Sequence, residues 1–508
     1  MELQFLMEGF VSLLNPQVIM WCLVGVTLGT LVGALPGLGP TAGVALLLPL
    51  CFSLDTLEAL VLLMGIYQGT MYGGRMSSIL VNVPGEASAV VTAFDGYPMT
   101  KKGKAGYALA LSAIASFIGG MIGFMGLVFL TPLVADWALI FSSPEYFALI
   151  LFALLATSGL GDQSLLKGLI AMGLGLLLSM VGMDAIQGSQ RLTFGLLGLW
   201  DGIELVVVAV GIFGISEVLV NIESKGKRSG DGDSSDIARK IPFKELFPTI
   251  KQIISNGWSI VRGALTGFFV GTLPGAGATV ATFLSYSTEK KLSKTPEQFG
   301  KGKDQGLSGP ESANNASIGG ALIPLFSMGI PGSGTGAILL GALIMLGLQP
   351  GPLMIEKSGD IIWATIAGLM LANVLLLILN TAFVPGFAWL IEVVKPYLAP
   401  LIAALCFIGV YMINYSYFEV GLMLLLGVLG YFLKKFHFPL APIVLALVLG
   451  GMLETNYRQS LLLSHNDFSI FFTRPIALVF MLLTIFVLIF PIIKKVFKIE
   501  KKQNDLTY

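Results

Sequence analysis

Four long stretches of this 508-residue chain contain no Asp, Glu, Lys or Arg. They are residues 9–54, 105–135, 312–355 and 361–391. An apolar helix of about 20 residues is long enough to cross a bilayer, and each stretch exceeds that length. Over the whole chain 12% of residues are charged, about half the share found in soluble proteins. The sequence therefore predicts an integral protein of the lipid bilayer and excludes a cytosolic enzyme.

Charge balance and cysteine content exclude further classes of protein. Thirty basic residues balance thirty acidic ones, so the net charge indicates no nucleic-acid partner. The three cysteines lie in or beside apolar segments without paired spacing, and the two histidines form no zinc motif. No Ser–His pair lies in matching apolar segments, as nucleophilic catalysis would need. We expect no catalytic residues, no enzyme activity and no bound organic cofactor.

One hydrophilic stretch divides the chain nearly in half. Residues 223–251 carry seven Lys or Arg and five Asp or Glu, which is typical of a solvated cytoplasmic linker. We expect a first membrane repeat at 1–222, a second repeat with an extra C-terminal helix at 252–493, and a cytoplasmic tail at 494–508. The predicted fold is an all-α polytopic membrane protein with about 12 transmembrane helices, some of them broken or re-entrant.

The two halves share a pair of motifs in the same order. Residues 25–41 (GVTLGTLVGALPGLGPT) and 263–279 (GALTGFFVGTLPGAGAT) are identical at nine of seventeen positions. Each contains a doubled GxxxG stripe followed by a Pro-Gly break. Downstream, residues 72–88 resemble residues 318–334, and Pro84-Gly85 matches Pro331-Gly332 after one inserted residue. Two motifs recurring in order indicate an internal duplication.

The positions of basic residues indicate how the two repeats insert. The first-half cluster, Lys101 to Lys104, follows the second Pro-Gly motif, whereas Lys290 to Lys303 lies between the two motifs of the second half. Cytoplasmic loops of membrane proteins carry an excess of Lys and Arg. If both clusters are cytoplasmic, the two repeats have opposite topology, so we predict an inverted repeat.

The Pro-Gly pairs predict breaks inside membrane helices at Pro36, Pro84, Pro274 and Pro331. Proline removes a backbone donor and glycine permits unusual dihedral angles. Irregular backbone at membrane depth is tolerated only where it is buried in protein or lines a wet cavity. Matching breaks in two repeats are typical of a transporter's central site. A simple kink or loop end is the alternative for each pair, and the GxxxG stripes themselves favour helix packing.

Polar residues flank these breaks and add candidate ligands for an anion or for Na⁺. Arg75 is the one cation in the otherwise uncharged stretch 59–85. Two interpretations of it remain open: it binds a substrate carboxylate, or it reaches an interface or pairs with Glu86 or Asp95. The predicted substrate or ion site comprises Pro36, Gly37, Gly39, Thr41, Gly73, Gly74, Arg75, Ser77, Asn82, Pro84, Gly85, Pro274, Gly275, Gly277, Thr279, Asn314, Asn315, Pro331, Gly332, Ser333 and Thr335.

From about residue 15 to 450 the chain resembles the large membrane subunit of the tripartite tricarboxylate transporter family. The resemblance lies in GALPGLGPTAG, YGGRMSSILVNVPGE with FDGYPMTKKGKAG, GTLPGAGATVATFLSY, and PESANNASIGGALIPLFSMGIPGSGTGAILLGAL. It implies a secondary importer of citrate-like or other organic carboxylates in the bacterial cytoplasmic membrane, driven by Na⁺ or H⁺. It also implies two partners: a small four-helix membrane subunit and an extracytoplasmic solute-binding protein.

The family's motif residues fall on Gly33, Pro36, Gly37, Gly39, Thr41, Tyr72, Gly73, Gly74, Asn82, Pro84, Gly85, Pro274, Gly275, Gly277, Glu311, Asn314, Asn315, Pro331, Gly332 and Ser333. Arg75 departs from the pattern, because the family usually has a small or hydroxylated residue after YGG. An added cation is expected to affect the choice of substrate. The alternatives to an importer are a channel or an exporter for small organic anions, and a purely structural membrane scaffold.

Overall fold

The computed structural model describes residues 2–35, 38–159, 164–184, 187–224, 246–384, 386, 393 and 397–504. The first half forms α1 (Glu2–Ser12), α2 (Pro16–Gly33), α3 (Pro40–Leu47), η1 (Leu48–Ser53), α4 (Thr56–Val81), α5 (Val90–Lys101), α6 (Ala105–Ala138), α7 (Ser143–Gly159), α8 (Leu165–Ser179), β1 (Gly182–Met183), β2 (Gln190–Arg191), η2 (Leu197–Leu199), α9 (Leu205–Ala209), the π-helical η3 (Val210–Ile215) and α10 (Ser216–Ser224).

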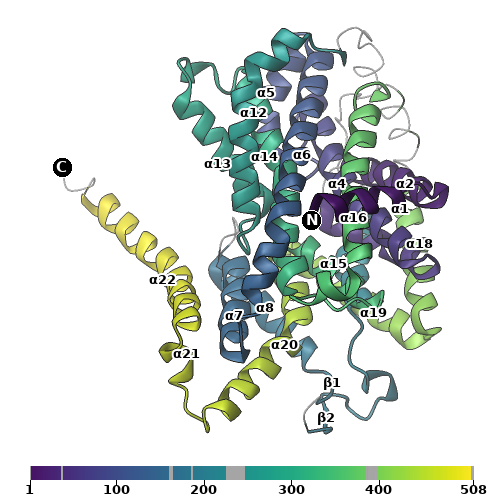
Figure 1. Cartoon of the computed structure of the whole chain (residues 1–508), viewed down its shortest axis with the longest axis vertical. Helices are drawn as coiled ribbons and strands as arrows, with labels where there is room; N and C mark the ends of the chain where they lie inside the picture. Colours follow the sequence, from purple (N-terminus) through teal and green to yellow (C-terminus); the bar gives the residue numbers. More distant parts are fainter. Residues whose placement is uncertain are drawn as a thin grey trace.

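The second half forms α12 (Ile250–Gly271), α13 (Gly277–Leu292), η5 (Pro296–Gln298), α14 (Asp304–Met328), α15 (Gly334–Met345), α16 (Met354–Leu379), α18 (Leu398–Asn414), α19 (Tyr417–Lys435), α20 (Ala441–Leu463), α21 (Ile470–Thr473) and α22 (Pro475–Asn504). Long helices such as α6 and α16 run along the long axis of the bundle, while α22 extends away from it (Figure 1). In the described residues the only sheet is the short β1–β2 pair, so the all-α prediction is confirmed.

Helices end and begin close to each Pro-Gly motif, and the long helices that precede the second motif of each half stop in the same way. The long helices α4 and α14 both end on a left-handed residue, Asn82 (φ 57°) and Gly329 (φ 70°), a common way to stop a helix. After the first motif, which follows α2, the short helix α3 begins with Pro40 in its first turn. A proline there costs nothing, because the N–H that it lacks would have no partner in the helix. Ser333 caps α15, because its Oγ accepts the N–H of Gly336 at 3.1 Å.

The glycine stripes pack an equivalent pair of helices together within each half. Gly25, Gly29 and Gly33 place α2 against α4, and Gly263, Gly267 and Gly271 place α12 against α14. A Cβ at Gly29 would lie 2.5 Å from the carbonyl oxygen of Ile66, and one at Gly271 would lie 2.9 Å from Cα of Ser317. Only glycine allows backbones this close, so the packing interpretation of the stripes is confirmed.

The two halves also pack into each other. The first-half helix α6 lies along α14, and α16 of the second half lies along α4. The Tyr72 hydroxyl on α4 donates to Asn373 Oδ1 on α16 at 2.7 Å, and Asn373 Nδ2 donates to the carbonyl oxygen of Phe117 on α6 at 2.9 Å. These buried hydrogen bonds hold three helices from both halves in one core.

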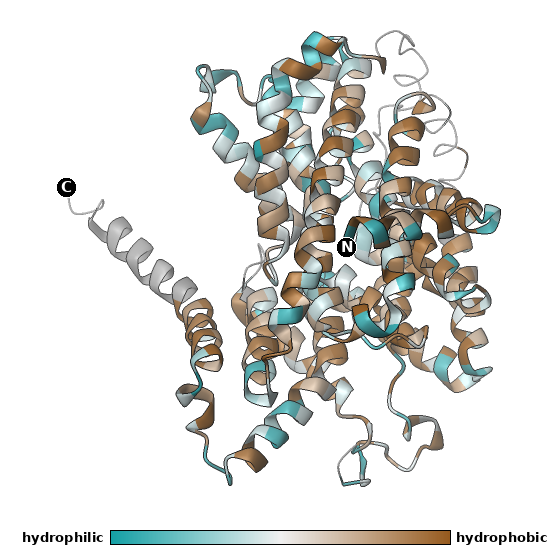
Figure 2. Cartoon of the chain, viewed as in Figure 1, coloured by the Kyte–Doolittle hydropathy of each residue, from teal (hydrophilic) through white to brown (hydrophobic). Residues whose placement is uncertain are grey.

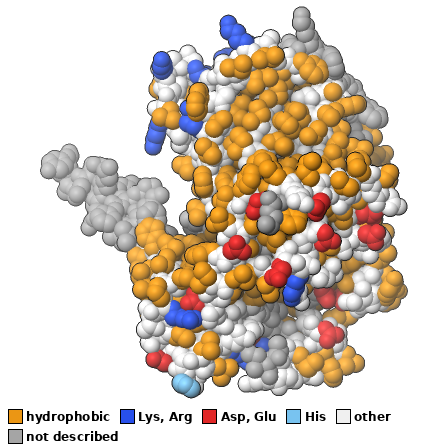
Figure 3. All heavy atoms as spheres, viewed as in Figure 1, with side chains coloured by type: hydrophobic (Ala, Val, Ile, Leu, Met, Phe, Trp, Pro, Cys, Tyr) orange, Lys and Arg blue, Asp and Glu red, His pale blue; other side chains and the backbone are white. Residues whose placement is uncertain are grey.

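The basic clusters of the two halves lie at the same end of the molecule. Asp95 on α5 accepts the backbone N–H groups of Gly300, Gly302 and Lys303 at 3.0, 2.8 and 2.7 Å, which fixes the α13–α14 turn against the α5–α6 region. Figure 3 shows Lys and Arg gathered at the end where α13 lies. A common side for both clusters is what the predicted orientation requires.

Five described helices are long and apolar enough to cross a membrane: Pro16–Gly33, Ala105–Ala138, Leu205–Glu223, Met354–Leu379 and Tyr417–Lys435. Shorter apolar helices, among them Pro40–Ser53 and Gly334–Met345, accompany them. Hydrophobic residues dominate these helices in Figure 2, and apolar side chains cover most of the face in Figure 3. The number of about twelve crossings stays a prediction.

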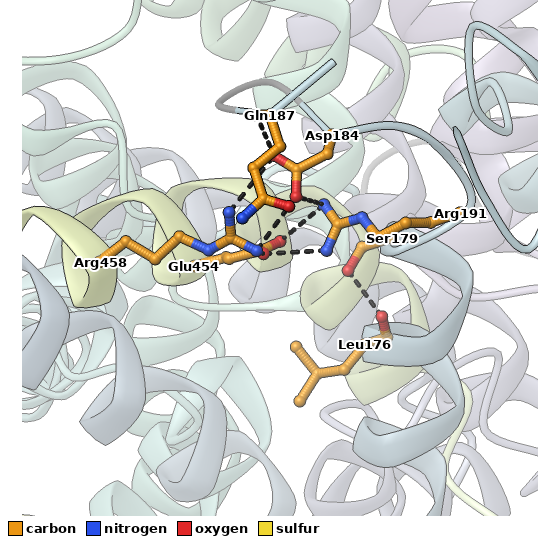
Figure 4. A network of polar contacts seen from close by, with 7 residues as sticks. All are labelled: Leu176, Ser179, Asp184, Gln187, Arg191, Glu454 and Arg458. Carbon is orange, nitrogen blue, oxygen red and sulfur yellow. Dashed lines mark hydrogen bonds and ion pairs between the residues drawn. The ribbon is translucent and has the colours of Figure 1, made fainter. Parts of the chain in front are cut away.

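A short hairpin is tied to α20 by ion pairs that the sequence does not predict. β1 and β2 pair antiparallel, with Gly182 opposite Arg191. Arg191 binds both carboxylate oxygens of Glu454, at 2.9 and 3.1 Å, and Arg458 contacts Asp184 at 3.1 Å (Figure 4). A bidentate Arg–carboxylate pair fixes geometry as well as distance. The hairpin is therefore positioned by α20, whose first residues lie at the site described below.

The predicted domain boundaries are only partly visible. α10 ends at Ser224 and α12 begins at Ile250, but residues 225–245 of the expected linker lie outside the described residues. At the C-terminus α22 continues past residue 493 to Asn504, so most of the expected tail is helical. Residues 505–508 are also outside the described part. The repeat and linker boundaries stay predictions.

Candidate functional site

A cavity of about 760 Å³ lies where the helix breaks of both halves meet. Its walls come from all four motif regions, from the end of α7 and from the turn before α20. The lining residues are Gly39, Pro40, Thr41, Tyr67, Met71, Pro84, Gly85, Glu86, Ala87, Ser88, Val90, Thr157, Ser158, Gly271, Gly275, Ala276, Gly277, Ala278, Thr279, Val280, Ser317, Ala321, Gly332, Ser333, Gly334, Thr335, Pro439, Ala441 and Pro442. Hereafter this space is the central cavity.

Four short helices begin at the central cavity. The first residues of α3, α13 and α15 line it, as does Val90 at the start of α5. The first N–H groups of a helix have no partner within the helix, and its N-terminus carries about half a positive charge. Four such ends around one cavity provide N–H donors and positive potential without a lysine or arginine in the wall.

Direct contacts close the ring of breaks. The N–H of Gly275 donates to the carbonyl oxygen of Gly332 at 2.8 Å, which joins the two breaks of the second half. The hydroxyls of Thr41 and Thr335 lie 2.9 Å apart, which joins the first break of one half to the second break of the other. Thr41 and Thr335 therefore meet although 294 residues separate them in the chain.

The backbone at Gly275 requires glycine for two reasons. Its φ is +80°, in the left-handed region that side chains disfavour. A Cβ there would also lie 2.5 Å from the carbonyl carbon of Ala156 and 2.5 Å from the backbone nitrogen of Thr157. The PG motif thus lets the break before α13 pack directly on the end of α7.

Glu86 follows the Pro84-Gly85 break and lines the central cavity. Its Oε1 accepts the hydroxyl of Ser88 at 2.6 Å and lies 3.5 Å from the Nδ2 donor of Asn314 on α14. Of the lining residues, Glu86 is the only Asp, Glu, Lys, Arg or His. From the sequence, Glu86 is expected only as one candidate partner for Arg75.

Arg75 lies outside the central cavity, in a buried polar network. Only 1% of its surface is exposed. Nη1 donates to Ser116 Oγ on α6 at 3.2 Å, and this hydroxyl donates to Glu311 Oε2 on α14 at 3.0 Å. Thr92 bonds the other oxygen of Glu311, and the guanidinium carbon of Arg75 lies 4.5 Å from the ring centre of Tyr72. Among the described residues, Arg75 makes no hydrogen bond or ion pair with Glu86 or Asp95, and the Asp95 carboxylate instead accepts N–H groups of the α13–α14 turn.

The structure brings about half of the predicted site residues to the central cavity. These are Gly39, Thr41, Pro84, Gly85, Gly275, Gly277, Thr279, Gly332, Ser333 and Thr335. Those outside its lining are Gly73, Gly74, Arg75, Ser77, Asn82, Pro274, Asn314, Asn315 and Pro331. Gly73 packs on the backbone of α2, and Ser77 Oγ donates to the carbonyl oxygen of Gly74 at 3.2 Å. Pro36 and Gly37 lie outside the described residues.

Several lining residues are not among those that the sequence predicts. Thr157 and Ser158 are a polar pair at the end of an apolar helix, which was a readable signal, and Glu86 directly follows a Pro-Gly break. Tyr67 lies in the middle of α4 and had no such signal. Pro439 and Pro442 belong to a segment without a repeat counterpart in the sequence comparison, so only the fold could bring them to the cavity.

A second cavity, of about 710 Å³, lies further along α15 and α20. Gly334 and Thr335 of α15 line the central cavity, and Gly341, Ile344 and Met345 of the same helix line the second one. α20 likewise reaches from one to the other, and further walls come from Met183 of β1 and from the segment that runs from the end of η2 to the first residue of α9, including Trp200 and Leu205. The two helices thus connect the site to the end of the molecule that carries the hairpin.

The described residues hold no group of three or more His, Cys, Asp or Glu that could bind a metal ion. A cavity ringed by interrupted helices and hydroxyl groups, inside a bundle with membrane-length apolar helices, defines a membrane transport protein.

Comparisons with known proteins agree with this class. Residues 19–445 match the model of the tripartite tricarboxylate transporter TctA family. The chain belongs to this family, as its motifs suggested, and is a multi-pass membrane component of a transporter. It is 42% identical over 469 residues, 92% of each chain, to the "Uncharacterized 52.8 kDa protein in TAR-I ttuC' 3'region" of Agrobacterium vitis. It is 40% identical over 211 residues to the "Uncharacterized protein in TAR-II ttuC' 3'region" of Agrobacterium vitis, covering 42% of this chain and 87% of that one.

Proposed function

We propose that this chain is the translocation subunit of a secondary importer for tricarboxylates or related organic carboxylates, and that the central cavity is its substrate site. One observation carries the proposal: α3, α5, α13 and α15 all begin at this cavity. Helix N-termini favour anions through their free N–H groups and their dipoles. Four of them suit a ligand that carries more than one carboxylate.

Hydroxyl groups complete the proposed site. Thr41, Thr279, Ser333 and Thr335 lie at or near these helix starts and line the cavity. Each hydroxyl can donate one hydrogen bond to a carboxylate oxygen. In this proposal the predicted residues that do not line the cavity, such as Gly73 and Asn315, support its walls, and Arg75 holds the surrounding helices.

The proposed transport cycle uses an inverted repeat. Supporting it, α2–α4 and α12–α14 pack through equivalent glycine stripes, and α4 and α14 end on the same type of cap. The basic clusters follow different motifs in the two halves and yet lie at one end of the molecule. Inverted repeats commonly open a shared site to the two sides of a membrane in turn. The second cavity is the proposed outward route.

The family's printed description, a tripartite transporter, supports two further components. We propose a small four-helix membrane subunit and an extracytoplasmic solute-binding protein that delivers the carboxylate. A cation gradient, Na⁺ or H⁺, drives import. The bacterial source of both relatives supports a location in the bacterial cytoplasmic membrane.

A channel or exporter for small organic anions is the alternative function. A channel needs a continuous polar path, whereas on α15 the fully buried apolar residues Ile338 and Leu339 lie between the residues that line the central cavity and those that line the second one. This buried apolar segment favours a closed gate over an open pore. An exporter differs only in direction, so transport measurements separate it from an importer.

Citrate, a tricarboxylate, and malate, a dicarboxylate, should each raise the unfolding temperature of the purified full chain. A ligand that binds only the folded state stabilises that state by about 2.7 kcal/mol when its concentration is a hundred times its Kd. Monovalent organic cations of similar size should not raise the unfolding temperature. In cells that also contain the two partner components, labelled carboxylate should accumulate inside. Stabilisation by none of a carboxylate panel, or release in place of uptake, would contradict the proposal.

A further inference from the structure

We infer that Glu86 is the residue through which a monovalent cation is coupled to carboxylate binding: H⁺ or Na⁺ must neutralise Glu86 before the anionic substrate occupies the central cavity. This inference rests on the proposed function and adds to it the group on which the cation acts. The chemistry shared by the two ions is neutralisation of a carboxylate, and the experiment below separates them.

The charge balance of the central cavity is the first observation. Glu86 is the only residue among its lining with a formally charged side chain at neutral pH. Two buried charges near the cavity are engaged by other groups: Glu311 is bound by Thr92 and Ser116, and Arg75 Nη1 donates to Ser116. Tyr67 of α4 is the remaining titratable lining residue. No described cation in the wall compensates Glu86.

An uncompensated carboxylate opposes an anionic ligand. Two like charges about 6 Å apart at an effective dielectric constant near 20 weaken binding by roughly a hundredfold. Neutralising Glu86 removes this opposition. Because linkage is reciprocal, the bound carboxylate substrate must strengthen binding of the cation at Glu86 by the same factor. This mutual dependence is the thermodynamic requirement for coupled transport.

An unpartnered oxygen atom beside Glu86 is the second observation. Asn314, whose Nδ2 lies 3.5 Å from Glu86 Oε1, is 1% exposed, and its Oδ1 has no hydrogen-bond partner. Buried polar atoms are rarely left unsatisfied without a reason. Amide and carboxylate oxygens are ligands suited to a hard cation.

The pseudo-symmetry of the two halves is the third observation. In the motif alignment Pro84-Gly85-Glu86 matches Pro331-Gly332-Ser333. Ser333 caps α15 with its hydroxyl, so the second half uses a neutral residue where the first half has a carboxylate. A serine is therefore sterically acceptable at such a break, and the negative charge at Glu86 is a specific addition to the first half.

The test compares citrate binding by the purified full chain with binding by Glu86→Gln and Glu86→Ser. Binding is measured at about pH 6 and about pH 8, each with NaCl and with choline chloride. We expect the wild-type Kd to fall by roughly tenfold to a hundredfold when the coupling cation is supplied. A response to pH alone identifies H⁺, and a response to sodium alone identifies Na⁺. In both variants the Kd should be independent of the cation.

Glu58→Gln is the matched control. Glu58 is a buried glutamate in the first turn of α4, 28 residues before Glu86 in the chain and outside the lining of the cavity, so its variant should keep the wild-type cation response. A cooperative thermal unfolding transition verifies that each variant is folded. If Glu86→Gln does not fold, the cation response is measured on Glu86→Ser alone. A wild-type cation response in a folded Glu86 variant would overturn the inference, as would cation-independent binding by the wild type. A wild type that binds no carboxylate instead contradicts the proposed function.

Discussion

Gly275→Ala should nearly abolish carboxylate uptake. Alanine at this position meets two penalties: a left-handed backbone costs about 1–2 kcal/mol for an L-residue, and the new Cβ would lie 2.5 Å from the backbone of Ala156 and Thr157. The break before α13 must move away from α7, which disturbs its hydrogen bond to Gly332. Misplacing a binding group by about 1 Å costs roughly a hundredfold in rate. Uptake of labelled citrate, normalised to the amount of protein in the membrane, measures the effect.

Gly257→Ala is the control for this variant. Gly257 lies on α12, the helix that leads to the same break, and a Cβ there meets nothing within 4 Å. Since alanine is also the better helix former, this variant should transport like the wild type. Normal uptake by Gly275→Ala would show that the tight approach of the break to α7 is unimportant for transport.

Arg75→Met should destabilise the folded protein strongly. Removing Arg75 leaves the Glu311 carboxylate buried without a nearby positive charge, and only the hydroxyls of Thr92 and Ser116 then stabilise it. Breaking a buried charge pair in this way costs about 3–5 kcal/mol. Because Arg75 does not line the central cavity, the folded fraction should keep the wild-type order of preference among carboxylates. Thermal unfolding and a competition assay measure the two effects.

The double variant Arg75→Met with Glu311→Gln should recover much of the lost stability, because no unpaired charge then remains buried. Lys435→Met is a control for the loss of a cation: Lys435 pairs with Glu223 at the surface, with about half of each side chain exposed, and surface pairs contribute little. A changed substrate preference in Arg75→Met would mean that this residue acts on the ligand, the other interpretation that the sequence left open.

The sequence predicted the parts of the fold that depend on local chemistry. Charge-free stretches predicted membrane helices, and the duplicated motifs located the helix breaks, because Pro and Gly act on their own backbone. The GxxxG stripes predicted close helix packing because glycine lacks a Cβ, whereas only the fold identifies α4 and α14 as the partner helices. The convergence of all four breaks on one cavity required the three-dimensional packing of α6 on α14 and α16 on α4, which no local pattern contains.

Individual site residues were harder to predict than their neighbourhood. Arg75 drew attention as the lone cation of its stretch, but the sequence could not place Ser116 and Glu311, from other helices, around it. Glu86 lies two residues beyond Pro84, and its importance follows only from the absence of other charged side chains in the cavity wall. A charge balance is a property of a surface formed by many segments, so it becomes visible only in the folded chain.

The most direct measurement of the central claim is substrate protection of a cysteine in the central cavity. Cys22, Cys51 and Cys406 are free and buried, so a single engineered thiol, Thr279→Cys, would dominate labelling by a hydrophilic thiol reagent. Citrate at about ten times its Kd, with the coupling cation present, should slow this labelling about tenfold. Labelling of Ser255→Cys, exposed on α12 away from the cavity, should not change. Equal labelling of Thr279→Cys with and without citrate, in a protein that citrate stabilises, would place the substrate elsewhere and contradict the account.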